Sequence, residues 1–204
     1  MSKEYRSDRR VRRTRNLLHG ALVSLIHQKP YDDIVVKEIL ARANVGRSTF
    51  YTHFRDKDDL LRSGIREMLR AGIPVAPAQA DCLADHVLRF SLPLFEHIQR
   101  YHAASDVADI PSDAPGKAVV HQRLEQEVTE LVDADLQRLG YEGDGRGGVP
   151  RTLLAQQVAS TFRLVLRWWL EHDDQLSLTR ADHMFRDLAR PVLTAALERK
   201  PPAA

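Results

Sequence analysis

The chain has 204 residues, 43% of them hydrophobic and 28% charged, which is enough for one small binding module and a second, larger core. Its one cysteine cannot form an internal disulfide or a cysteine-rich zinc site. No apolar stretch approaches the roughly 18 residues of a membrane span, and the charged N-terminus does not resemble a signal peptide. We therefore expect a cytoplasmic protein with no membrane association, no metal and no cofactor.

The net charge of +2 hides an uneven distribution. Residues 1–65 contain 14 Lys and Arg against 8 Asp and Glu, whereas the remaining residues contain 16 against 20. A basic N-terminal third favours a polyanionic partner for that part of the chain. On charge alone, a solvated basic face with no partner explains the pattern equally well.

Apolar residues recur at steps of three and four along most of the chain, which predicts an all-α fold. The first helix is expected over residues 8–28, stopped by Pro30. Two short helices follow, over 36–43 and 47–54, joined by the turn residues Asn44 to Gly46. Asp56 is expected to cap the next helix.

Beyond that helix, Gly72, Pro74 and Pro77 mark a junction. We expect an N-terminal three-helix domain over 1–65, with its connecting helix reaching about residue 71, and a C-terminal helical bundle over 72–204. The expected C-terminal helices are 81–102, bent by Pro93, then 119–139, 151–172, and 179–199, kinked or broken at Pro191.

The segment 36–54 has the pattern of a helix-turn-helix, in which buried apolar residues fix the angle between two helices. Arg47 can form a bidentate contact with a guanine edge, while hydroxyl groups and His53 can donate to phosphates. Lys57 could bind a phosphate at the start of the following helix. Tyr51 could instead be a packed aromatic residue, and His53 could support the helix. The side chains expected to face outward are Gly46, Arg47, Ser48, Thr49, Tyr51 and Thr52.

The run from Tyr31 to Ile39, followed by Ala43 to Lys57, resembles the signature of the TetR/AcrR regulators, and the resemblance covers residues 9–62. It implies a DNA-binding domain and no enzymatic activity. Val35 departs from the family, which usually has Thr or Ser there as helix cap and phosphate contact; Asp33 is expected to cap instead. The resemblance implies base contacts for Lys37, Arg47 and Ser48, and backbone contacts or support for Thr49, Tyr51, Thr52, His53 and Lys57.

The resemblance further implies a homodimer through the last two helices, a pseudo-palindromic operator and a small effector bound in the C-terminal domain. The apolar stripes of those helices could equally be covered by an internal core. Core filling is also the alternative for each candidate effector-binding residue. These candidates are Phe90, His97, Tyr101, Arg123, Gln157, Phe162 and Trp169.

Leu166 to Glu171 is similar to a stretch in regulators of dihydroxyacetone-kinase operons, a similarity of few residues that implies no ligand. A DNA-binding architectural or division-control protein without an effector is an alternative on the same fold. An α-helical enzyme is a third, although no catalytic signature is present. The glycine-rich residues 143–148 predict an inter-helix loop, because no βαβ context surrounds them.

Overall fold

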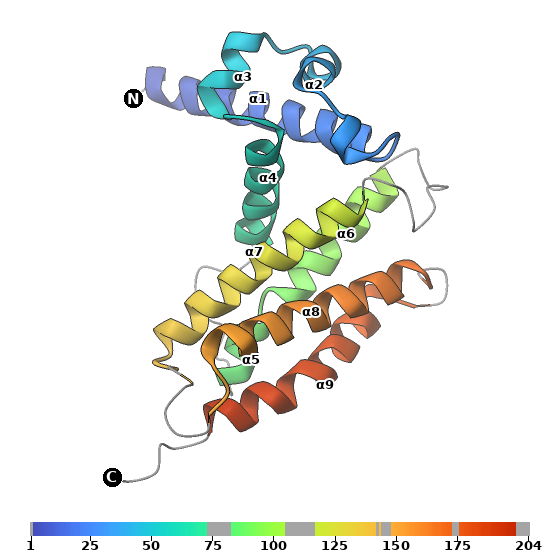
Figure 1. Ribbon diagram of the computed structural model, residues 1–204. Helices are drawn as coiled ribbons and strands as arrows, with labels where there is room; N and C mark the ends of the chain where they lie inside the picture. The colour runs from blue at the N-terminus through green and yellow to red at the C-terminus, as the bar shows by residue number, and fades with distance from the viewer. Residues whose placement is uncertain are drawn as a thin grey trace. The chain divides into compact units, whose positions relative to one another are not determined.

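The computed structural model describes residues 2–72, 83–104, 117–141, 143, 148–172 and 176–198. Every regular element in these ranges is helical, which confirms the all-α expectation (Figure 1). The chain divides into two compact units, Met1–Arg66 with Asp109–His121, and Glu67–Ala108 with Gln122–Ala204.

The first unit is built on a long helix that packs along a helix-turn-helix. The long helix, α1, begins well before the expected start at Asp8. A core of fully buried side chains joins the helices: Leu18, Leu22, Ile34, Ile39, Phe50 and Leu60. The elements are α1 (Ser2–Ile26), the 3₁₀ turn η1 (Tyr31–Asp33), α2 (Val36–Ala43), α3 (Arg47–His53) and the first part of α4 (Lys57–Gly72).

The turn between α2 and α3 depends on Asn44, which adopts the left-handed conformation with φ of 51°. The Val45 amide donates to the Leu40 carbonyl at 3.1 Å and the Asn44 amide to that of Ala41 at 3.3 Å. This pair of bonds is the Schellman arrangement, which satisfies the last carbonyls of a helix and reverses the chain. The expected turn residue therefore sets the direction in which α3 leaves.

The capping of α4 is also confirmed. The Asp56 carboxylate accepts a hydrogen bond from the Asp59 amide at 2.7 Å, and the Asp59 carboxylate accepts one from the Arg55 amide at 3.0 Å. These side chains satisfy backbone donors at a helix N-terminus, where a negative charge is also favourable. The α3–α4 connection is thereby fixed by local sequence.

The second unit packs α5, α6 and α8 against α9 around an aromatic core. The rings of Phe90, Phe95, Phe162, Phe185 and Trp169 are at most 2% exposed and contact one another at centroid distances of 5.0–5.8 Å. Figure 1 shows α8 and α9 running side by side. The elements are α5 (Leu83–Leu88), α6 (Ser91–Ala104), α7 (Lys117–Arg138, whose first residues belong to the other unit), α8 (Arg151–Leu170) and α9 (Leu178–Leu197).

The expected bent helix over 81–102 is two helices, α5 and α6, separated at residues 89–90. Pro93 has no amide proton to bond the carbonyl of Arg89, so it is accommodated in the first turn of α6 rather than inside a helix. Pro191, in contrast, lies inside α9, and the helix continues through it without a break.

Buried acidic groups tie the second unit together. Asp182, 4% exposed, accepts hydrogen bonds from Ser91 on α6 and, at 2.9 Å, from Arg186 on its own helix. Asp135, 1% exposed, is paired with Arg89 and Arg138. Both carboxylates are therefore compensated by arginine, as buried charges require.

Candidate nucleic-acid interface

Helix α3 has one buried side that holds it in place. Phe50 is fully buried and Phe54, directly after the helix, is 3% exposed; their ring centroids lie 5.7 Å apart. From α1, the ring of His19 lies 5.8 Å from that of Phe54, and the Arg15 guanidinium lies 5.7 Å from it. A helix of seven residues is unstable alone, so this aromatic packing is what orders α3.

The opposite side of α3 is open to solvent. The expected outward residues, Gly46, Arg47, Ser48, Thr49, Tyr51 and Thr52, are all outside the core, and His53 is half-buried. The Arg47 guanidinium lies 5.6 Å from the ring centroid of Tyr51, which is 49% exposed. The Thr52 hydroxyl donates to the Ser48 carbonyl at 2.9 Å, so its proton is already used within the helix.

The cations of the helix-turn-helix fall into two groups. Lys29 is paired with Glu38 at 2.6 Å, and Arg42 donates to Ser24 on α1 and to Gln28, two residues after the end of α1. Among the described residues, Lys37 on α2 and Arg47 on α3 have no ion-pair partner, and both lie outside the core. These two cations without an ion-pair partner are two of the three residues expected to face bases.

Lys57 stabilises the fold, a role that the sequence analysis did not predict. Its ammonium donates to the carbonyl oxygens of Tyr31, Asp32 and Ile34 at 2.8, 3.1 and 3.0 Å. An ammonium has three protons, and these three acceptors use all of them. Lys57 thus fastens the start of α4 to the segment that precedes α2.

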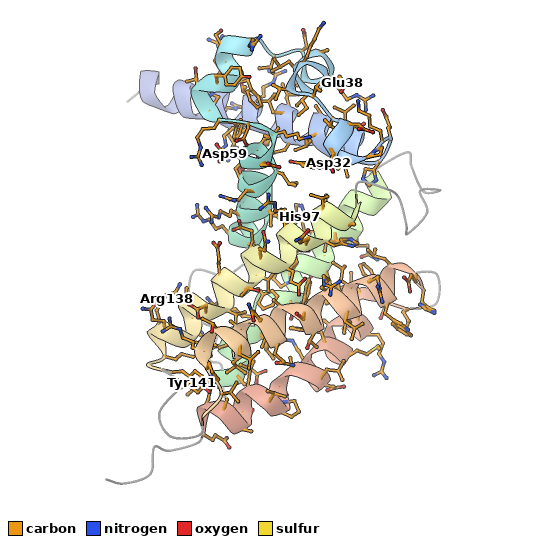
Figure 2. The ribbon with its side chains drawn as sticks, in the orientation of Figure 1. Asp32, Glu38, Asp59, His97, Arg138 and Tyr141 are labelled. Carbon is orange, nitrogen blue, oxygen red and sulfur yellow. The ribbon has the colours of Figure 1, made fainter. Side chains whose placement is uncertain are left out.

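At the start of α2, the cap position is Val35, not Asp33, which belongs to η1. Val35 has no side-chain acceptor, and Glu38 compensates by accepting a hydrogen bond from the Val35 amide at 3.1 Å. The bond from Lys29 lowers the pKa of Glu38, helped by the Val35 amide. The expected capping by Asp33 is therefore wrong, and Glu38 (Figure 2) orders this helix start.

Gly46 is the cap residue of α3, with ordinary φ and ψ of −70° and 149°. A Cβ placed there would meet only Thr49 Oγ1, at 3.9 Å. Neither backbone strain nor crowding within the protein therefore requires glycine at this position. A glycine at this position lets an outside surface approach the backbone closely.

The expected effector-binding residues occupy different environments. Phe90 and Phe162 are in ring contact at 5.5 Å, and the Trp169 indole donates to the Leu176 carbonyl at 3.1 Å. On α8 the Gln157 amide donates to Thr161 at 3.0 Å, while its buried Oε1 has no partner among the described groups. The remaining three are Arg123, which donates to Gln126 at 3.2 Å, His97, which is half-buried, and Tyr101, whose side chain lies outside the described residues.

An exposed apolar patch lies on the last two helices, and sequence reasoning identified it only in part. The apolar stripes expected on these helices combine side chains that are buried in the unit's own core, such as Phe162, Trp169 and Phe185, with the exposed Leu188 and Val192. The other exposed apolar residues lie outside the expected stripes. The patch, called here the α8–α9 patch, consists of Leu153, Leu164, Trp168, Leu188 and Val192, at 54, 54, 39, 53 and 40% exposed.

The described residues include neither a candidate membrane span nor a candidate metal site. None of their helices is both long and apolar enough to cross a bilayer. No group of three or more His, Cys, Asp or Glu side chains among them is arranged to hold a metal ion.

Comparison with known proteins supports the geometry of the first unit. Residues 18–63 match the family described as bacterial regulatory proteins, tetR family. Over 65 residues, 31% of this chain, the sequence is 38% identical to the uncharacterised HTH-type transcriptional regulator YxbF of Bacillus subtilis, but that match spans only 17% of YxbF. The N-terminal segment is therefore similar to the helix-turn-helix domain of that family.

Longer matches are more distant. The chain is 27% identical over 165 residues to the uncharacterised HTH-type transcriptional regulator Rv0767c of Mycobacterium tuberculosis, covering 78% of this chain and 72% of that protein. A TetR transcriptional regulator from Streptococcus agalactiae superimposes with a TM-score of 0.52 at 24% identity, covering 92% of this chain and 99% of the other. This structural match shows a shared fold.

Proposed function

We propose that the protein is a transcriptional regulator that binds double-stranded DNA by inserting the exposed side of α3 into the major groove. The single observation that carries this proposal is the two-sided character of α3. Phe50 and Phe54 are buried in the core, and the opposite side presents Arg47 with no ion-pair partner among the described residues. A helix-turn-helix reads DNA with the N-terminal residues of such a helix.

In the proposed complex, some side chains contact bases, others contact the phosphate backbone, and Lys57 stabilises the domain. Arg47 and Lys37 contact base edges, where a bidentate arginine discriminates by about 1–3 kcal/mol, and Ser48 lies beside them. Thr49, Tyr51 and His53 contact or support the phosphate backbone, which fixes the register of the protein on the duplex. Thr52 uses its proton within α3 and can act only as an acceptor or a packing group. Lys57 positions α4 against η1 through its three carbonyl bonds.

We also propose that two copies associate through the α8–α9 patch. Two adjacent helices that both expose large apolar side chains offer a surface for a self-complementary contact. A two-fold dimer would present two α3 helices roughly 34–36 Å apart, one turn of DNA, and would recognise a pseudo-palindromic operator. Residues 1–65 would bind the DNA, and residues 72–204 would form the dimer.

We propose further that the protein acts in the cytoplasm as a repressor, and that a small effector bound in the second unit controls its affinity for DNA. A second candidate is a DNA-binding architectural protein without an effector. The packing of Phe90, Phe95 and Phe162 against one another favours it, because an effector entering there would have to displace aromatic contacts. The subgroup resemblance of Leu166–Glu171 stays a prediction.

The experiment is selection of bound duplexes from a random-sequence pool by the purified full chain. The proposal expects enrichment of a pseudo-palindromic motif with half-sites about 10 base pairs apart, bound more tightly than unselected duplex. Recovery of sequences with no common motif would contradict it. Adding a metabolite extract during binding distinguishes the two candidates, since only an effector-controlled regulator would release the selected duplex.

A further inference from the structure

The first half of α1 carries an arginine stripe on its solvent side. Arg9, Arg10, Arg12 and Arg13 are exposed, whereas Leu18 on the other side of the helix is fully buried. Residues 1–15 contain seven Lys or Arg against two Asp or Glu. The stripe, called here the α1 arginine stripe, is the most cationic segment of the chain.

None of these four arginines has an ion-pair partner among the described residues. Arg9 lies three and four positions before Arg12 and Arg13, so the guanidinium groups lie on neighbouring turns of one helix face. Like charges at these spacings destabilise a helix, and an amphipathic helix gains nothing in packing from them. A cost to folding without a compensating contact indicates that an external anion is the partner of this face.

The stripe belongs to the same compact unit as α3. Arg15, two residues after Arg13, has its guanidinium 5.7 Å from the ring centroid of Phe54, the residue directly after α3. Figure 1 shows the N-terminal half of α1 extending past α3. From Arg9 to Arg13 the helix rises about 6 Å, close to two steps of a DNA strand at roughly 3.4 Å each.

We infer that the α1 arginine stripe is a second DNA-binding surface, which binds the phosphate backbone flanking the base pairs contacted by α3. This inference rests on the proposed function. The stripe contributes affinity and salt dependence but no base preference, because phosphates carry no sequence information. The duplex that the protein covers is therefore longer than the half-site that α3 contacts.

The test compares the triple variant R9Q/R12Q/R13Q with the control R70Q/R167Q/R180Q, which removes the same charge from exposed positions outside the first unit. The probes are a duplex selected from a random-sequence pool and the same duplex extended by about one helical turn, roughly 10 base pairs, on each side. Affinity is measured over a range of salt concentrations. Thermal unfolding verifies that both variants are folded.

For the wild type and the control, we expect tighter binding and a steeper salt slope on the extended duplex. For the stripe variant, the extension should add no affinity, and the slope should fall by about 0.9 for each phosphate that is no longer neutralised, with the preferred base sequence unchanged. Equal slopes for the stripe and control variants would overturn the inference. If the wild type selects no motif at all, the proposed function fails instead, so the two failures are distinguishable.

Discussion

Lys57 and Tyr31, 26 residues apart, are joined twice. The Lys57 ammonium donates to the Tyr31 carbonyl at 2.8 Å and lies 4.6 Å from the centroid of the Tyr31 ring. The Tyr31 hydroxyl in turn donates to Asp58 at 2.6 Å. These contacts hold the start of α4 against the segment that leads into α2. The helix-turn-helix is therefore stabilised by residues that lie before and after its own two helices.

Replacing Lys57 by Met keeps the aliphatic chain and removes all three donors. We expect the free energy of unfolding to fall by about 1.5–3 kcal/mol, the range for hydrogen bonds to a charged group, as measured by urea denaturation. Lys37→Met, at a cation without an ion-pair partner among the described residues, should change it little. A salt slope of DNA binding that falls by one unit in Lys57→Met would make Lys57 a phosphate contact as well.

Glu38→Gln removes the negative charge that Lys29 and the Val35 amide stabilise, and leaves one of the two acceptor oxygens. Because these bonds lower the folded-state pKa of Glu38 below 4.5, the stabilising contribution is complete above the unfolded value and is lost as the pH falls through the lower, folded one. The wild type should therefore be more stable than Glu38→Gln at neutral pH, and the difference should disappear on acidification below pH 4.5.

Chemical denaturation at a series of pH values checks this expectation. Glu198→Gln, at an exposed position with no ion-pair partner among the described residues, is the control and should show no such convergence. A Glu38→Gln difference that grows as the pH falls would have the wrong sign for a carboxylate stabilised in its charged form.

Gly46→Ala separates folding from DNA contact. A Cβ at residue 46 meets nothing closer than 3.9 Å, so the melting temperature should fall only slightly, because alanine is a poorer N-cap than glycine, whereas affinity for a selected duplex should fall if the backbone approaches the DNA closely. The control is Gly20→Ala, in open space inside α1, which should stabilise by about 1 kcal/mol through helix propensity. Affinity that is the same in both variants would remove Gly46 from the interface.

Leu188→Glu places a charge in the middle of the α8–α9 patch, where Leu188 is 53% exposed. Light scattering coupled to gel filtration should give twice the 23.2 kDa chain mass for the wild type and a single chain for the variant. Leu17→Glu, at a leucine 47% exposed on α1, is the matched control and should keep the wild-type mass. A dimeric Leu188→Glu would move the association surface elsewhere.

Local signals in the sequence were enough to predict the helix-turn-helix. Asn44 tolerates the left-handed conformation, Asp56 supplies a cap within its own turn, and Phe50 and Phe54 repeat at helical spacing. Each of these features depends on residues no more than about four positions apart, so it can be predicted from a short stretch of sequence.

What the sequence could not reveal depends on distant partners. The acceptors of Lys57 lie 23 to 26 residues away, so its folding role has no local signature. On α8, Trp168 and Trp169 are adjacent, and only tertiary packing decides that Trp169 is buried and Trp168 exposed. The N-terminal extension of α1 was missed for a different reason, because its charged residues carry no apolar periodicity.

In the proposed complex with DNA, Arg47 contacts a base edge from the exposed side of α3. The most direct test measures the affinity of Arg47→Ala for every single-base variant of a selected duplex, with Arg70→Ala as the control for removal of an exposed arginine. We expect a loss of about 1–3 kcal/mol on the preferred duplex and a relaxed preference at one position of each half-site. An equal loss on all sequences, with every base preference intact, would contradict it.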